Sequence, residues 1–95
     1  MARVVVTESA RADLLSMIRT HSLPASTIER FRASLVPLAD FPEIGPPLEG
    51  RWNGYRFVLG PWPWMLLVYI WDQATDVVAI VTVQDARSAS AATSG

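Results

Sequence analysis

Arginine side chains carry most of the chemistry that this sequence offers. All eight basic residues are arginine, and Arg51, Arg56 and Arg87 lie in or beside the elements that the C-terminal half of the sequence predicts. A guanidinium group stays charged, so it binds a phosphate or a partner's carboxylate well but transfers protons poorly. We therefore treat these arginines as candidates for binding a partner. The catalytic residues stay unknown, with Arg56 and Arg87 as the candidates.

Each arginine also has an ordinary structural interpretation. Arg87 can pair at the surface with Asp85 or Asp72, Arg56 can lie on the face of a sheet, and Arg51 can be a solvated loop residue. His21 follows the first predicted helix, where an imidazole interacts favourably with the negative helix end. We prefer that role for His21 to a catalytic one.

The sequence offers no recognisable set of metal ligands. Cysteine is absent, which excludes thiolate sites, and no glycine-rich phosphate loop or zinc pattern occurs. The aspartates do not have the spacing of metal ligands, and those between the last two strands are common turn formers. We therefore expect neither a metal nor a cofactor. The aspartates considered are Asp13, Asp72, Asp76 and Asp85.

Two tryptophans stand out among the four in the chain. Trp62 and Trp64 lie in a connection between two predicted strands, framed by Pro61 and Pro63. Large rigid aromatic side chains in such a place are hard to bury completely in a small domain, and exposed ones are common anchors at protein interfaces. We predict that Trp62 or Trp64 contacts a partner, although the loop could also fold both back onto the edge of the sheet.

Composition limits the class of protein. The 95 residues are 51% hydrophobic with a net charge of −1, which suits one small domain and disfavours strong non-specific binding of nucleic acid. The longest apolar run, residues 62–71, is about half of the roughly 20 residues that a membrane span needs. No signal peptide is visible, so we expect a cytoplasmic protein without membrane contact. The predicted domain spans residues 1–87, and the Ser/Ala-rich residues 88–95 are predicted to be a flexible tail.

Hydrophobic spacing predicts the elements in the first half of the chain. Residues 3–6 are a β-branched run typical of a strand, and Thr7 is placed to cap a helix of about 13 residues. The pattern from Ser26 to Glu29 is that of a capping box, which predicts the start of a second helix. Pro37 should either end this helix near Val36 or kink it.

The second half of the chain reads as a loop followed by strands. Residues 40–54 are rich in proline and glycine, and Phe41, Ile44 and Leu48 are expected to pack this loop. Short connections join the strands, which favours antiparallel hairpins. The sequence therefore predicts an α+β fold of two layers, in which an N-terminal strand and a helical hairpin pack on an antiparallel sheet. The predicted strands are residues 55–59, 65–71 and 77–83.

With this order of elements, the chain resembles toxins of the RelE/ParE superfamily from bacterial type II toxin–antitoxin modules. One motif is Thr-x-x-Ala-x-x-Asp-Leu at the start of the first helix, and another is Leu-x-x-x-Pro-x-x-Gly after the second helix. The central hairpin and the closing strand with its arginine are also similar. The resemblance covers roughly residues 4–87. The similar segments are residues 7–14, 38–45, 54–60, 67–69 and 83–87.

The resemblance implies a toxin that inhibits growth and is neutralised by a cognate antitoxin, with which it could form a hetero-oligomer. ParE-like members inhibit DNA gyrase, whereas RelE-like members cleave mRNA on the ribosome. The second route needs a base, an acid and positive charge, yet the chain lacks lysine and has Leu66 where such members often have an arginine. We therefore favour a target-binding toxin without enzymatic activity. An mRNA interferase and an inactive member that only binds antitoxin are the alternatives.

Overall fold

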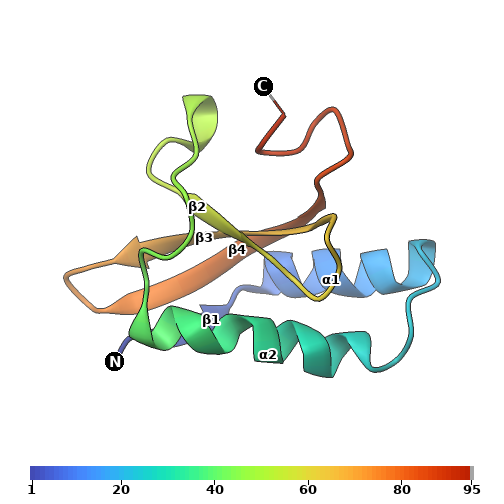
Figure 1. The fold of residues 1–95 in the computed structure, drawn as a ribbon, viewed down its shortest axis with the longest axis horizontal. Helices are drawn as coiled ribbons and strands as arrows, with labels where there is room; N and C mark the ends of the chain where they lie inside the picture. The colour runs from blue at the N-terminus through green and yellow to red at the C-terminus, as the bar shows by residue number, and fades with distance from the viewer. Residues whose placement is uncertain (95) are drawn as a thin grey trace.

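The computed structural model describes residues 1–94, and Gly95, part of the predicted tail, lies outside the described residues. The strands and helices follow the order that the sequence predicts, with a short 3-10 helix added in the proline-rich loop (Figure 1). The predicted α+β fold is therefore confirmed. In chain order the elements are β1 (Arg3–Val6), α1 (Glu8–Thr20), α2 (Thr27–Asp40), η1 (Gly50–Trp52), β2 (Arg56–Leu59), β3 (Met65–Asp72) and β4 (Val77–Asp85).

The strands of residues 1–94 form one four-stranded sheet in the order β1-β4-β3-β2. Strands β2, β3 and β4 are antiparallel, as the short connections predict. The expectation of a wholly antiparallel sheet is wrong for β1, which pairs parallel to β4, so the sheet is mixed. Only a tight connection requires antiparallel neighbours, and β1 is separated from the other strands by both helices.

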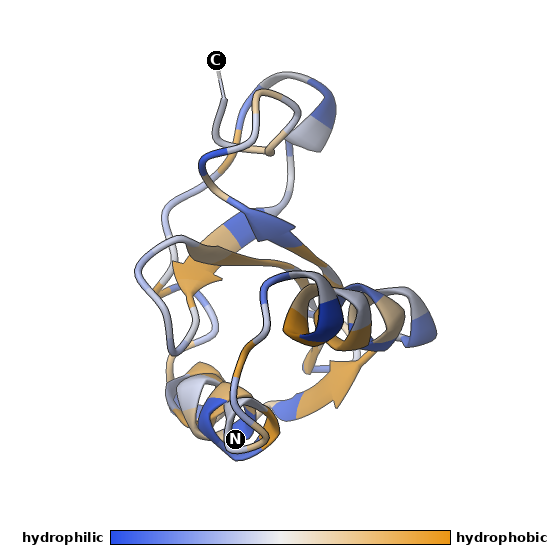
Figure 2. Cartoon of the chain, turned by 90° about the vertical axis from the view of Figure 1, so that its right-hand side faces the viewer, coloured by the Kyte–Doolittle hydropathy of each residue, from blue (hydrophilic) through white to orange (hydrophobic). Residues whose placement is uncertain are grey.

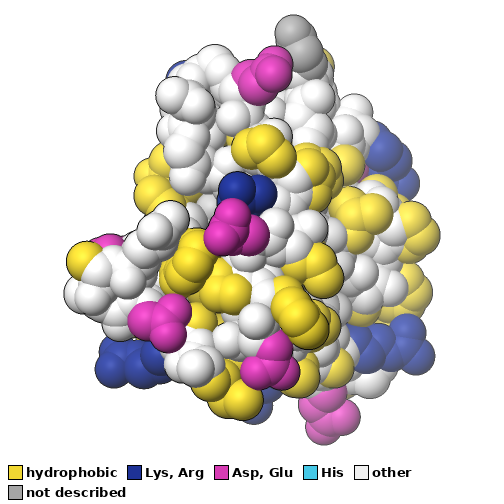
Figure 3. All heavy atoms as spheres, turned by 60° about the vertical axis from the view of Figure 1, so that its left-hand side comes forward, with side chains coloured by type: hydrophobic (Ala, Val, Ile, Leu, Met, Phe, Trp, Pro, Cys, Tyr) yellow, Lys and Arg dark blue, Asp and Glu magenta, His cyan; other side chains and the backbone are white. Residues whose placement is uncertain are grey.

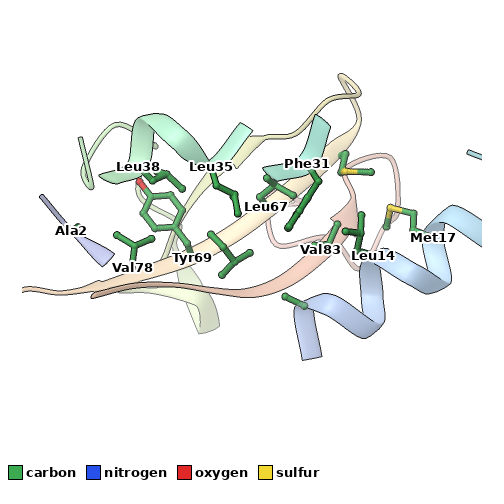
Figure 4. Packing of buried hydrophobic residues seen from close by; sticks show 13 residues of the cluster. Ala2, Leu14, Met17, Phe31, Leu35, Leu38, Leu67, Tyr69, Val78 and Val83 are labelled. Carbon is green, nitrogen blue, oxygen red and sulfur yellow. The ribbon is translucent and has the colours of Figure 1, made fainter. Parts of the chain in front are cut away.

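Both helices lie on one face of the sheet (Figures 1 and 2). Buried apolar residues of both helices form one core with alternate residues of β3 and β4, and Figure 2 shows hydrophobic and hydrophilic residues on each helix. Figure 4 shows this core, in which Phe31, Leu38 and Tyr69 are almost completely buried. The other core members are Ala2, Ala10, Leu14, Met17, Leu35, Met65, Leu67, Val78, Ile80 and Val83.

A second, smaller core covers the opposite face of the sheet. Leu66 and Val68 of β3 point to this side and meet Leu48 from the proline-rich loop and Ala91 from the C-terminal segment. Strand β3 is therefore buried on both faces, as its uninterrupted apolar run predicts. No helix in residues 1–94 is both long and apolar enough to cross a bilayer.

The N-terminus of α1 is tied directly to β4. Thr7 accepts a hydrogen bond from the Ala10 N–H at 3.2 Å, which confirms it as the helix cap, and its hydroxyl donates to the Ile80 carbonyl at 2.9 Å. β1 ends opposite Ile80, so β4 has no strand beside it on that edge from Val81 onward. Along this unpaired part of β4, the Asp13 carboxylate accepts hydrogen bonds from the Val83 N–H at 3.3 Å and from the Thr82 hydroxyl at 2.6 Å.

Helix α2 differs from its prediction at its N-terminus, and at Pro37 it does not end near Val36, which was one of the two predicted outcomes. Ser26 makes no side-chain capping bond, so the predicted capping box is wrong. The Thr27 N–H instead donates to the Pro24 carbonyl at 3.0 Å, and this turn holds Ser26 in helical backbone geometry. The helix also continues through Pro37 to Asp40. A proline inside a helix costs about 3 kcal/mol, and the complete burial of Leu38 offsets part of that cost.

The loop after α2 is held in place by its backbone. We call residues 41–44 the Phe41–Ile44 turn, because the Ile44 N–H donates to the Phe41 carbonyl at 3.0 Å. The prediction that Phe41 and Ile44 pack the loop is wrong, since they are 62% and 56% exposed, whereas Leu48 is buried as predicted. The Tyr69 hydroxyl donates to the Pro42 carbonyl at 2.8 Å and accepts the Gly45 N–H at 3.0 Å.

A β-bulge interrupts the pairing of β3 with β4. Val68 faces Thr82 and Tyr69 faces Ile80, which leaves Val81 as the extra residue. The bulge reverses the alternation of side chains along β4. Val78 and Ile80 before it, and Val83 after it, all contribute to the core under the helices.

The segment after β4 turns back over the second core. Ala91 is 6% exposed, and the Ala92 N–H donates to the Gln84 side chain at 2.7 Å. The flexibility that the sequence predicts for residues 88–95 stays a prediction for the protein in solution.

Candidate functional site

An imidazole, an indole, a carboxylate and a guanidinium group meet where α1, β4 and the β2–β3 connection come together. Asp85 Oδ2 lies 3.2 Å from His21 Nε2 and 2.8 Å from Arg87 Nη2. Arg87 Nε also donates to Asp85 Oδ1 at 2.9 Å, so the arginine binds the carboxylate through two nitrogens. This pairing is the ordinary structural interpretation that the sequence allows for Arg87.

Trp64 is the platform of this cluster. Its ring stacks on His21 with centroids 4.9 Å apart and an interplanar angle of 17°, and the Arg87 guanidinium carbon lies 4.6 Å from a ring centroid. Such cation–π contacts contribute roughly 0.5–1 kcal/mol at exposed sites. Sequence reasoning selected Trp64 and Arg87 separately, and the fold places them in contact.

Three local features bring the cluster together. His21 is the C-cap of α1, and its backbone N–H donates to the Met17 carbonyl. The bulge at Val81 turns Asp85 toward the helix side of the sheet, because it shifts the alternation of β4 by one residue. The Ala86 N–H donates to the Trp64 carbonyl at 2.7 Å, which fixes the β2–β3 connection beside the end of β4.

The Asp85 carboxylate contacts both His21 and Arg87. Hydrogen bonds from the Arg87 side chain and backbone, followed by the one from His21, hold the pKa of Asp85 well below its usual range. The same contact raises the pKa of Arg87. Asp85 is therefore ionised at neutral pH and acts only as an acceptor.

The neighbours of the His21 ring favour one tautomer. Because the ionised Asp85 can only accept, the His21 Nε2–H donates to it, and Nδ1 lies 2.9 Å from the Thr20 hydroxyl. Both ring nitrogens are thus engaged within the domain. In the neutral ring the basic nitrogen is Nδ1, so a substrate hydroxyl would have to displace Thr20 before His21 could remove its proton.

Arg56 does not join this cluster. Its Nη1 donates to the Gly45 carbonyl at 2.8 Å, and its Nη2 lies 3.6 Å from Glu43 Oε2. In the register of the sheet, Arg56 lies opposite Tyr69 of β3, whereas Asp85 lies opposite Met65, four residues away along the same strand. Four residues of a strand span about 13 Å. In this structure Arg56 holds the loop after α2 instead of contributing to a cationic site.

Arg51 lies on the opposite side of the sheet from the helices. It is exposed on η1, with its guanidinium carbon 5.9 Å from the Trp52 ring centroid. Here η1 and the C-terminal segment border an open groove of about 730 Å³. Glu49 and Arg51 bring charges of opposite sign to the groove, which is otherwise lined by small and apolar residues. These are Pro47, Leu48, Gly50, Trp52, Phe57, Ala89, Ser90, Ala91, Ala92, Thr93 and Ser94.

Trp62 folds back toward the helices. It is half-buried against the main core, and the Arg30 guanidinium carbon lies 5.3 Å from its ring centroid. Its indole N–H is buried and has no hydrogen-bond partner among residues 1–94. The position matches the folded-back alternative more closely than an exposed anchor, and its role toward a partner stays a prediction.

Sequence reasoning placed His21 at the helix end but missed its contact with Asp85. The two residues are 64 positions apart, and no local pattern signals a contact that depends on the bulge in β4. The exposure of Phe41 and Ile44 was also missed, because apolar residues in a proline-rich loop usually indicate packing. Residues 1–94 contain no group of at least three histidine, aspartate or glutamate side chains suited to a metal ion.

Comparison with known families identifies the class. The mixed sheet with a helical hairpin on one face is the fold of bacterial toxins from toxin–antitoxin pairs, and residues 4–89 match the family described as the ParE toxin of the type II toxin–antitoxin system parDE. The chain belongs to this family and is a toxin of a type II system. The resemblance seen in the sequence is thereby confirmed. No curated protein sequence matches the chain significantly.

Solved structures support the same fold. A chain of the RelBE2 toxin–antitoxin complex of Mycobacterium tuberculosis is 27% identical, with a TM-score of 0.60 over 88% of this chain and 96% of that chain. The conserved hypothetical proteins HP0892 and HP0894 of Helicobacter pylori are 16% and 17% identical, with TM-scores of 0.58 and 0.57. Each match covers 90% of this chain and 94% of the other, and at this identity each supports the fold alone.

Proposed function

We propose that this toxin inhibits growth by binding a macromolecular target, with DNA gyrase as the first candidate, and that a cognate antitoxin neutralises it in a hetero-oligomeric complex. Membership of the ParE family supports the choice of target, because the resemblance to ParE-like toxins implies inhibition of gyrase. The solved RelBE2 structure is a complex of toxin and antitoxin, which supports an antitoxin partner here.

The observation that carries the proposal is that both ring nitrogens of His21 are already hydrogen-bonded within the domain. RNA cleavage through a 2′-hydroxyl needs a free base, and the basic nitrogen of the neutral His21 ring faces Thr20 at 2.9 Å. Arg87 is likewise engaged with Asp85 through Nε and Nη2. A site whose polar groups satisfy one another suits the presentation of a fixed surface better than proton transfer.

A second function has one observation in its favour. His21, Asp85 and Arg87 do converge, and a carboxylate that orients an imidazole is a recurrent arrangement in acid–base catalysis. An mRNA interferase would then use Nδ1 of His21 after Thr20 moves aside, with Arg87 binding the phosphate. This enzyme needs a change of conformation that the binding toxin does not.

Two assays on the same purified protein separate these functions. The first is DNA supercoiling by gyrase, and the second is cleavage of mRNA on translating ribosomes. We expect inhibition of supercoiling and intact mRNA, with growth arrest on induced expression that the co-expressed antitoxin reverses. Cleaved mRNA that is lost with His21→Ala and with Arg87→Ala, but kept with Arg11→Ala, would establish the interferase instead. Absence of growth arrest would favour an inactive member that retains only antitoxin binding.

A further inference from the structure

The Phe41–Ile44 turn exposes two large apolar side chains to solvent. Phe41 is 62% exposed and Ile44 is 56% exposed, and they line a shallow pocket of about 530 Å³ together with Pro42. Figure 3 views this side of the molecule and shows hydrophobic side chains with acidic ones and a basic one among them. Exposed apolar groups that lie together are typical of interaction sites.

The backbone beneath these side chains is fixed at several points. Tyr69 binds the turn through the Pro42 carbonyl and the Gly45 N–H, and Arg56 binds it through the Gly45 carbonyl. Gly45 itself lies directly against the Phe57 carbonyl, where a Cβ atom would not fit. A fixed turn loses little conformational entropy on binding, so its apolar side chains contribute more fully to affinity.

The side-chain charges at the turn are two carboxylates, of Asp40 and Glu43, and the guanidinium group of Arg56, which leaves a negative balance. The carboxylates of Asp40 and Glu43 flank the exposed side chains, and the turn follows the C-terminus of α2, which carries partial negative charge. The last turn of α2 contains no basic residue. Among residues 1–94, Glu43 pairs with Arg56 whereas Asp40 takes part in no ion pair. A complementary partner therefore combines apolar side chains with lysine or arginine.

We propose that the Phe41–Ile44 turn is a docking site for the cognate antitoxin, which contributes a segment with apolar side chains next to basic ones. The inference rests on the proposed toxin–antitoxin function and adds the location and chemistry of the contact. In it, Phe41 and Ile44 are the apolar anchors and Asp40 pairs with a cation of the antitoxin. The cluster of His21, Asp85 and Arg87 is not part of this contact.

The test measures affinity for the antitoxin, taken as the product of the small open reading frame adjoining the gene. Isothermal titration calorimetry compares the wild-type chain with the double variant Phe41→Ser/Ile44→Ser. Loss of two anchors at the centre of an interface is expected to weaken binding by roughly 30-fold or more. Asp40→Asn is expected to weaken binding roughly threefold and to reduce its dependence on salt.

Matched controls separate docking from folding. Leu15→Ser removes an apolar side chain of similar exposure, 44%, from α1 and is expected to leave the affinity unchanged. Thermal unfolding checks that the double variant stays folded. The single variant Phe41→Leu, which keeps an apolar anchor, is expected to bind the antitoxin almost as tightly as the wild-type chain. In cells the double variant should still arrest growth, while the antitoxin no longer reverses the arrest.

The outcomes distinguish this inference from the proposed function. If the wild-type chain does not bind the product of the adjoining gene, the toxin–antitoxin assignment of the partner fails. If the wild-type chain binds and the folded double variant binds equally well, only the docking site is overturned. A double variant that keeps its antitoxin affinity but loses growth arrest assigns the turn to the target and overturns the inference as well. Sedimentation that shows the wild-type chain alone to dimerise, and the variant not to, also overturns it by making a second copy the occupant.

Discussion

The Tyr69 hydroxyl accepts a hydrogen bond from the Gly45 backbone N–H at 3.0 Å. This contact joins the most buried strand, β3, to the loop after α2, and it lies below the exposed Phe41–Ile44 turn. Burial raises the pKa of Tyr69, so the hydroxyl stays protonated at neutral pH and also donates to the Pro42 carbonyl. The same tyrosine therefore serves as a core residue and as the anchor of a surface loop.

Removing this hydroxyl tests the anchor. Tyr69→Phe leaves the buried Gly45 N–H without its partner, which is expected to lower the free energy of unfolding by about 1–3 kcal/mol. Urea denaturation followed by tryptophan fluorescence measures the change. The control is Tyr55→Phe, which keeps the edge contact of that ring with Trp52 and is expected to have a smaller effect. Equal effects of the two variants would show that the Tyr69 hydroxyl has no special role.

A side chain at Gly45 should not be tolerated. A Cβ atom there would overlap the Phe57 carbonyl oxygen and approach the Tyr69 hydroxyl to 2.9 Å. Gly45→Ala is expected to cost about 1–3 kcal/mol or more, because it forces a backbone shift. Gly50→Ala is the matched control, since nothing lies within 4 Å of its added atom and its cost comes from a φ of 65°. Thermal unfolding of both variants compares the steric cost at Gly45 with the conformational cost at Gly50. If Gly45→Ala destabilises the fold less than Gly50→Ala does, the close approach at Gly45 is contradicted.

The ionisation of Asp85 predicts a pH dependence. Its pKa is lower in the folded than in the unfolded state, so the carboxylate stabilises the fold above its unfolded pKa of about 4. This stabilisation is lost as the pH falls through the lower folded value. Arg87→Ala removes the main cause and is expected to raise the folded pKa toward its ordinary value. A carboxyl titration by NMR measures it, with Arg51→Ala as the variant that should leave the Asp85 curve in place.

Truncation tests the C-terminal segment. Ending the chain after Arg87 removes Ala91 from the second core and takes the N–H partner from Gln84. We expect the free energy of unfolding to fall by about 1–2 kcal/mol. A shorter truncation that removes only residues 93–95 is the control. Unchanged stability after the longer truncation would instead support the flexible tail that the Ser/Ala-rich composition predicts.

The fold was predictable because its signals are local. The spacing of apolar residues in α1, the cap at Thr7 and the unbroken apolar run of β3 each specify an element without reference to the rest of the chain. The parallel pairing of β1 was not predictable in this way. The helical hairpin places β1 next to β4, and the choice of that neighbour is decided by the packing of the whole domain.

The candidate site was predictable only in part. The chemistry of arginine and tryptophan selected Trp64 and Arg87, which do meet. The inclusion of His21 and Asp85 depends on the end of a helix meeting the end of a strand, which residue types alone do not encode. Arg56 was selected as a candidate for the same chemical reason, but its guanidinium group donates to the carbonyl of Gly45 inside the domain.

The extra residue in β4 links two parts of the surface that face away from each other. Because Val81 shifts the phase of the strand, Asp85 meets His21 on one side and Gln84 holds Ala92 on the other. A one-residue slip that places Val81 opposite Val68, in the position that Thr82 now has, would exchange the orientations of Gln84 and Asp85. The imidazole would lose its carboxylate and the C-terminal segment its anchor in a single step, whereas a substitution at either position disturbs one side. Loss of the bulge through a shift in register therefore disturbs more of this surface than a change of one side chain.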